Sequence, residues 1–213
     1  MLVSMTSSEP NGLRAVIVTA HPDPHSATMG TASAVREGLR GNGCTEVVHR
    51  DLVATGFDPV FGAGDLHAYR GDTALPADVR AEQRFLEGFD LIVLVFPVHW
   101  WSLPAALKGW IDRVFTRGWA YDDTGAGIEL TAARNLYFVG IGGAGPDLYE
   151  RRGYANAMRT TLVDGIGGYL ETSGSNLILL HDGEAESPEQ HRRRDEAARE
   201  AGASIGQSVA CLA

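Results

Sequence analysis

The amino-acid sequence predicts an α/β fold, in which helices cover both faces of a five-stranded parallel sheet to give three layers. Two observations support this prediction. Five apolar runs alternate with segments whose apolar residues recur at helical spacing. Three of the runs, AVIV, LIVLVF and LILL, are almost continuously apolar, which is typical of strands buried on both faces. A chain of 213 residues is long enough to bury such a core.

The first part of the chain supplies two strands and two helices. We expect a strand over residues 14–20, which a His-Pro-Asp-Pro segment ends. Apolar residues at helical spacing predict a helix over 26–39, and the Gly-Asn-Gly sequence after it is a stop signal. A short strand follows over 45–49. Residues 57–76, rich in Gly, Asp and Pro, predict a long loop, and 77–87 predict a helix.

The middle of the chain combines a buried strand with an aromatic loop. Residues 91–96 form the most apolar strand, and two adjacent tryptophans follow it. A helix is expected over 104–115, with Ser102 as its cap and Pro104 in its first turn. This helix carries an apolar stripe that we assign to core or dimer packing: Leu103, Leu107, Trp110 and Val114.

The remaining segments complete the alternation of strands and helices. Strands are expected over 135–141 and 176–180, and helices over 151–170 and 188–209. No linker, repeat or low-complexity tract divides the chain. Residues 13–213 are therefore expected to form one domain.

Composition and charge disfavour several kinds of partner. The formal net charge of −9 argues against a broad nucleic-acid or anionic-membrane surface. No apolar run reaches about 18 residues, so no membrane span is expected. Cys44 and Cys211 are interpreted as free thiols of a cytoplasmic protein. Neither they nor the histidines show metal-ligand spacing, so no metal is expected. Residues 1–12 are polar and are interpreted as a flexible N-terminal segment.

Ligands bind at the carboxyl ends of parallel strands, and the first loop there leads directly into a helix. It contains His21, Ser26, Ala27 and Thr28. Free amides and the helix dipole at such a helix start attract phosphate, and the hydroxyl groups and the His21 ring add donors. Ser26 is explained equally well as a simple helix cap. Neither GxGxxG nor GxxxxGK[ST] is present, which argues against a Rossmann fingerprint and a P-loop.

The second loop contains Pro97, Val98, His99, Trp100 and Trp101. Its backbone amides can bind the polar edge of a flat ligand, and its aromatic side chains can wall that ligand off. Adjacent side chains of an extended chain point in opposite directions. At least one tryptophan is therefore expected to line a pocket or a partner surface. The alternative is that both are core or interface residues.

The third loop contains Gly140, Ile141, Gly142 and Gly143 and leads to Tyr149. Glycines directly after a strand let the backbone approach a ligand closely, and the Tyr149 hydroxyl can donate a hydrogen bond. The alternative is an ordinary flexible turn, since the chain contains 26 glycines. No GxSxG elbow is present, which disfavours a serine hydrolase.

Together these segments resemble the NAD(P)H dehydrogenase (quinone) family, a flavodoxin-like group. The group includes quinone reductases, modulator-of-drug-activity proteins and potassium-efflux ancillary oxidoreductases. The resemblance runs from AVIVTAHPDPHSAT to Gly153 and is most specific in FPVHWWSLPAALKGWIDRVFTRGWAY. It implies a flavodoxin-like three-layer sandwich, a bound flavin, NAD(P)H as electron donor and a homodimer.

The resemblance also implies how the three loops hold a flavin. The first loop, with His21, Ser26, Ala27 and Thr28, would bind the flavin phosphates. Residues 97–101 would contact the isoalloxazine ring, and the glycine segment 140–143 would lie over it.

Further residues take roles from the same resemblance. Tyr149 would act as the catalytic residue at the polar edge of the flavin. Trp119 and Tyr121 would line the acceptor pocket, Tyr121 often from the partner subunit. A histidine found six residues after the tyrosine in mammalian members is Ala155 here, so a tyrosine–histidine relay is not expected. FAD is favoured over FMN because the arginine-rich segment that includes Arg192 lies where FAD-binding members hold the adenosine half.

The resulting hypothesis is a two-electron transfer from NAD(P)H through the flavin to a quinone or another flat acceptor. Donors in residues 142–149 would stabilise negative charge that develops at the flavin edge. One alternative is a flavodoxin-type electron carrier, although a phosphate loop with His21 and two prolines argues against it. Another is a regulatory flavoprotein subunit of a potassium-efflux system.

Overall fold

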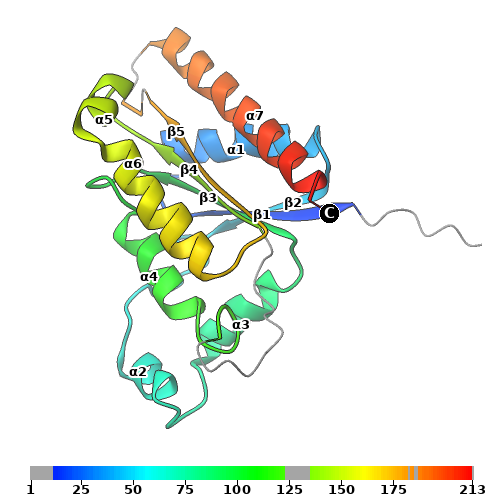
Figure 1. Ribbon diagram of the computed structural model, residues 1–213, viewed down its shortest axis with the longest axis vertical. Helices are drawn as coiled ribbons and strands as arrows, with labels where there is room; N and C mark the ends of the chain where they lie inside the picture. Colours follow the sequence, from blue (N-terminus) through cyan, green and yellow to red (C-terminus); the bar gives the residue numbers. More distant parts are fainter. Residues whose placement is uncertain (1–11, 123–134, 182, 185–186, 213) are drawn as a thin grey trace, which may run out of the picture.

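The computed structural model describes residues 12–122, 135–181, 183–184 and 187–212. Five parallel strands form one sheet in the order β2-β1-β3-β4-β5, which confirms the predicted fold class (Figure 1). The segment interpreted as a flexible start lies outside the described residues, except for Gly12. The strands are β1 (Leu13–Thr19), β2 (Cys44–Asp51), β3 (Leu91–Pro97), β4 (Asn135–Ile141) and β5 (Gly174–Leu180).

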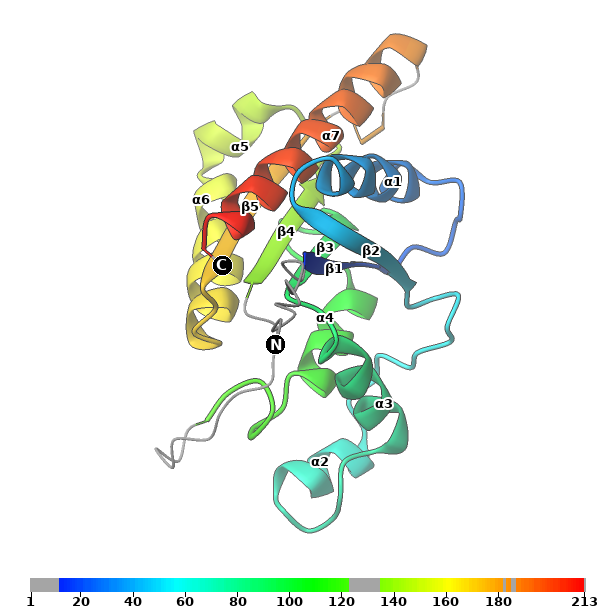
Figure 2. The same ribbon diagram turned by 90° about the vertical axis from the view of Figure 1, so that its right-hand side faces the viewer.

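The helices form two outer layers. On one face of the sheet, α1 (Ala27–Arg40) and α7 (Pro188–Ala210) lie side by side (Figures 1 and 2). The other face is covered by α3 (Ala77–Leu86), α4 (Ala105–Val114) and α6 (Tyr154–Arg159), which continues into the π-helical segment η1 (Thr160–Gly167). Two short helices complete the fold: α2 (Ala63–Tyr69) and α5 (Pro146–Arg152).

Both faces of β3 are buried, and its residues alternate between two hydrophobic clusters. Leu91, Val93 and Val95 pack with α1 and α7, whereas Ile92, Leu94 and Phe96 pack with α3, α4 and α6. All six are at most 1% exposed. The almost continuous apolar run of this strand therefore follows from burial on both sides. The predicted stripe Leu103, Leu107, Trp110 and Val114 lies in the same core, as expected.

The prediction of a continuous loop over 57–76 was wrong, because residues 63–69 form α2. The Asp65 carboxylate accepts a hydrogen bond from the Gly62 amide at 2.8 Å, which stabilises the start of the helix. Arg113, 48 residues away in α4, donates its Nε to Asp65 Oδ1 at 2.9 Å. Local sequence does not contain this partner, so it did not reveal the helix.

Arg113 also connects α4 to the segments on either side of α2. Its Nη1 donates to the Asp58 carbonyl at 2.5 Å and to Asp78 Oδ2 at 2.7 Å, and its guanidinium lies over the Phe57 ring. The hydrogen bond from Arg113 lowers the pKa of the Asp78 carboxyl. Both Arg113 and Asp65 are at least nine-tenths buried, so removing either would leave a buried charge without its partner.

Two helix starts differ from the prediction. Pro104, not Ser102, is the N-cap of α4, because the Ser102 backbone pairs with His99 instead. The helix expected over 151–170 already begins at Pro146, and it breaks at Gly153, which has a φ of 72°.

The packing of α4 against residues 57–62 gives a stability prediction. A Cβ atom at position 109 would lie 2.1 Å from the Pro59 carbonyl oxygen. Gly109→Ala should therefore lower the free energy of unfolding by about 2 kcal/mol, measured by urea denaturation. Gly30→Ala in α1, where a Cβ would meet nothing within 4 Å, should raise it by up to about 1 kcal/mol. Equal effects of the two substitutions would contradict this packing argument.

Candidate functional site

The three predicted loops meet at the carboxyl edge of the sheet. The strand order reverses between β1 and β3, which makes their loops the switch point where ligands bind in this architecture. The Val98 amide donates to the Ile141 carbonyl at 2.9 Å, and the Gly142 amide donates to the Leu180 carbonyl at 2.8 Å. The segments after β3 and β4 are thus hydrogen-bonded to the last residues of β4 and β5, respectively.

The first loop ends in a capped helix. Ser26 is the N-cap of α1, and its Oγ accepts a hydrogen bond from the Met29 amide, so Ser26 does cap this helix. The His21 Nδ1 lies 3.1 Å from the Asp23 amide. Thr28 is buried, whereas Ala27 lies at the edge of a cavity. These contacts stabilise the loop, and the predicted role of its residues in phosphate binding stays a prediction.

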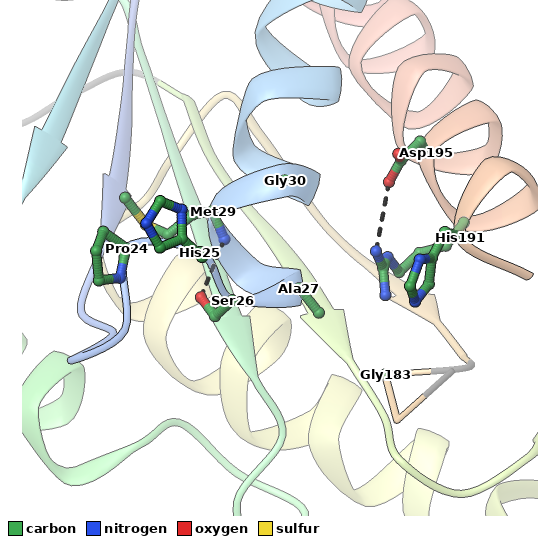
Figure 3. A pocket seen from close by; sticks show the side chains of 10 residues that line it. Pro24, His25, Ser26, Ala27, Met29, Gly30, Gly183, His191 and Asp195 are labelled. Atoms are coloured by element: carbon green, nitrogen blue, oxygen red, sulfur yellow. Dashed lines mark hydrogen bonds and ion pairs between the residues drawn. The ribbon is translucent and has the colours of Figure 1, made fainter. Parts of the chain in front are cut away.

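That cavity, of about 540 Å³, separates the first turns of α1 and α7 (Figure 3). Its α7 wall includes Arg194, whose side chain is 8% exposed. The Arg194 Nη2 lies 3.6 Å from Asp195 Oδ1, and among the described residues its Nε has no hydrogen-bond partner. A buried guanidinium with an unused donor fits an anionic ligand such as a phosphate. The residues lining this cavity are Pro24, His25, Ser26, Ala27, Met29, Gly30, Gly183, His191, Arg194 and Asp195.

Arg192 does not line this cavity and is exposed on α7. Sequence reasoning selected Arg192 and missed Arg194, two residues further along the helix. The arginine run 192–194 contained the signal, but only the packing of α7 on α1 shows which member is buried.

The aromatic loop is a tight turn with an unusual backbone. His99 and Ser102 exchange two backbone hydrogen bonds, of 3.1 and 3.0 Å. Trp100 and Trp101 between them have φ values of 50° and 56°. Two consecutive positive φ angles are typical of Asn-Gly turns, and each costs a bulky residue about 1–2 kcal/mol. Local strain of this kind is found at functional sites.

The two tryptophans have different surroundings. Trp100 is 88% exposed, and the chain is a turn here and not extended, so the prediction that one tryptophan lines a pocket or a partner surface stays a prediction. Trp101 stacks on Tyr154, with ring centroids 4.0 Å apart and an interplanar angle of 31°. Sequence reasoning missed Tyr154, because no pattern links it to the aromatic loop.

Tyr149 lies beneath the glycine loop. It is 4% exposed, and burial raises the pKa of its phenol. A Cβ atom at position 142 would lie 2.6 Å from the Tyr149 Oη, so only glycine allows this approach. Tyr154 makes an edge contact with Tyr149 at 6.3 Å. Ala155 packs against the core and offers no polar group.

The two residues assigned to the acceptor pocket lie away from the aromatic loop in this chain. Trp119 is 7% exposed, and its indole N–H donates to Glu87 at 3.1 Å. Tyr121 lines a second cavity, of about 700 Å³, beyond the carboxyl end of α4. The aromatic loop precedes the other end of this helix, whose ten residues span about 15 Å. A single chain therefore does not bring Tyr121 to the aromatic loop.

The part of the chain that the structure describes contains neither a metal-ligand cluster nor a membrane-spanning helix. No group of three or more potential ligand residues (His, Cys, Asp or Glu) comes together in this part of the chain. No helix within the same ranges has the length and apolar character needed to cross a membrane.

Comparison with known proteins agrees with this arrangement. Residues 14–205 match a family model described as a flavodoxin-like fold. The chain belongs to this flavodoxin-like family. Among solved structures, NAD(P)H:quinone oxidoreductase from Methanothermobacter marburgensis is similar to it, with a TM-score of 0.80 and 25% identity. That similarity covers 91% of this chain and 97% of the other.

Two mammalian relatives of this flavodoxin-like chain carry quinone dehydrogenase names. NAD(P)H dehydrogenase [quinone] 1 of Rattus norvegicus is 31% identical over 78% of this chain and 66% of the relative. Ribosyldihydronicotinamide dehydrogenase [quinone] of Mus musculus is 36% identical over 54% of this chain and 56% of the relative. The chain thus spans between about half and two thirds of these relatives.

The strained turn gives a prediction that separates stability from binding. Trp100→Gly should raise the free energy of unfolding by about 1 kcal/mol, because glycine adopts a positive φ without strain. Because the resemblance places this loop against the isoalloxazine ring, the substitution should also weaken the affinity for FAD or FMN by up to about tenfold through loss of an aromatic contact, measured by fluorescence titration. Glu171→Gly, at another positive φ of 52° away from the loops, should raise stability alone. Unchanged flavin affinity in Trp100→Gly would remove Trp100 from the binding site.

Proposed function

We propose that the protein is a flavin-dependent NAD(P)H:quinone oxidoreductase that transfers two electrons from NAD(P)H to a quinone or another flat acceptor. The observation that carries this proposal is the strained aromatic turn at the switch point, with Tyr149 buried beside it. The names of the relatives support the same activity.

The bound flavin would supply the acceptor and donor of the hydride. The residues of this chain would orient it and exclude water. Amides of residues 97–101 and 140–143 would bind the ring edge, and Trp101, held by Tyr154, would form one wall of the site. The Tyr149 hydroxyl would donate a hydrogen bond where negative charge develops.

The decisive experiment combines a visible spectrum with NAD(P)H oxidation in the presence and absence of menadione. The purified protein should be yellow, and menadione should accelerate the oxidation. Tyr149→Phe should lower kcat by about tenfold to a hundredfold, within or below the general acid–base range. A protein that remains flavin-free after reconstitution would overturn the proposal, and unchanged turnover in Tyr149→Phe would remove this residue from the mechanism.

FAD is the proposed flavin, with FMN as the alternative. A second phosphate and an adenosine need space beyond the first turn of α1, and the cavity beside Arg194 offers it. Arg194→Gln should weaken FAD binding about tenfold or more and leave FMN binding nearly unchanged. Arg192→Gln, on the exposed side, is the matched control. Chromatography of the released flavin checks its identity, and FMN alone would contradict the choice of FAD.

A cytoplasmic homodimer is the proposed form of the protein. Tyr121 lines a cavity at the opposite end of α4 from the aromatic loop, so an acceptor pocket containing both needs a second copy. Exposed apolar side chains line that cavity: Phe61, Leu66 and Tyr69. Sedimentation of the flavin-loaded protein as a monomer at assay concentrations would contradict the dimer.

A further inference from the structure

The last residue of β5 and the segment after it hold the glycine loop through three hydrogen bonds. The Gly142 amide donates to the Leu180 carbonyl at 2.8 Å, and the Gly183 amide donates to the Gly142 carbonyl at 3.1 Å. The third bond uses a side chain: His181 Nδ1 lies 2.8 Å from the Ala144 carbonyl oxygen. Because a carbonyl oxygen only accepts, the Nδ1 atom carries the proton in this contact.

The same imidazole ring packs against Tyr149. The ring centroids are 5.1 Å apart, with an interplanar angle of 73°, an edge-to-face geometry favoured between aromatic rings. Tyr154 makes the other edge contact of Tyr149. The phenol is therefore held between His181 and Tyr154, and neither contact occupies its hydroxyl.

The start of α5 depends on this anchor. Its N-cap is Gly145, which has no side chain to form a capping hydrogen bond. The side-chain hydrogen bond next to this helix start comes instead from His181 to the carbonyl of Ala144, the residue before the N-cap. Tyr149 follows one turn later on α5. The position of its hydroxyl relative to Gly142 therefore depends on how firmly Ala144 is held.

We propose that His181 is a positioning residue, whose hydrogen bond to Ala144 fixes the glycine loop and Tyr149 in the geometry that the reaction requires. The proposal rests on the proposed function, because it concerns the donors at the same site. Sequence reasoning assigned no role to His181, which lies 32 positions after Tyr149 and on another element.

Two substitutions separate the hydrogen bond from the ring contact. His181→Phe keeps an aromatic ring and removes the donor. His181→Asn removes the ring and keeps an N–H at the place of Nδ1. His181→Phe should lower kcat for menadione reduction by about tenfold through misplacement of donors, with little change in KM, and His181→Asn should retain most of the wild-type kcat. The reverse order would overturn the proposal, since ring packing would then be the function of His181.

A second readout follows Tyr149 itself, independently of turnover. In flavin-loaded protein labelled with ¹³Cζ-tyrosine, the Tyr149 signal is identified by its loss in Tyr149→Phe and followed with pH. Burial raises the pKa of this phenol, so loosening the loop should lower the pKa towards its ordinary value in His181→Phe and leave it raised in His181→Asn. An unchanged pKa in His181→Phe would overturn the proposal. If His181→Phe does not fold, His181→Ala replaces it in both measurements.

The two readouts also separate this proposal from the proposed function. A wild-type protein that does not reduce menadione, but whose Tyr149 pKa responds to His181 as expected, would refute the reductase activity and retain the positioning role. An active wild-type protein in which His181→Phe changes neither kcat nor the Tyr149 pKa would retain the reductase activity and refute the positioning role.

Discussion

Burial of both faces of the sheet is the constraint on which the rest of the structure depends. Alternate residues of β3 enter two separate cores, so helices must cross each face and return the chain to the same end of the sheet. Parallel strands follow, and their carboxyl ends share one edge. The aromatic, glycine-rich and helix-capping loops are therefore brought together by the packing of the sheet, although they are far apart in sequence.

Buried ionic contacts fix α4 relative to that edge. Trp110 donates its indole N–H to Glu82 at 3.2 Å, and Glu82 pairs with Arg50 on β2. Arg113, one turn further along α4, holds Asp65 and Asp78. The LKGWIDRV segment therefore has a structural role, as a scaffold. It joins α4 to α2, α3 and the sheet, and so determines where the preceding aromatic loop lies.

Backbone strain lies in the aromatic turn, whereas the stabilising contacts lie in the scaffold around α4. The scaffold buries paired charges and well-packed apolar side chains. The aromatic turn instead contains two tryptophans at positive φ, one of them almost fully exposed. A surrounding structure that is rigid enough to hold such a turn can present aromatic side chains before a ligand arrives, which lowers the ordering cost of binding.

The sequence by itself determined the strand and helix alternation, the parallel sheet and the positions of the three loops in the chain. The spacing of apolar residues and the start and stop signals of helices are local properties, so the sequence contains them. It also assigned Trp110 to core or dimer packing and not to the ligand site. Only the tertiary structure decided that α2 exists and that Arg194, not Arg192, faces the cavity. It also decided that Tyr154 contacts Trp101 and that His181 contacts Tyr149. These features depend on partners from distant elements. A buried charge or a ring contact is specified by what packs against it, and no local pattern contains that information.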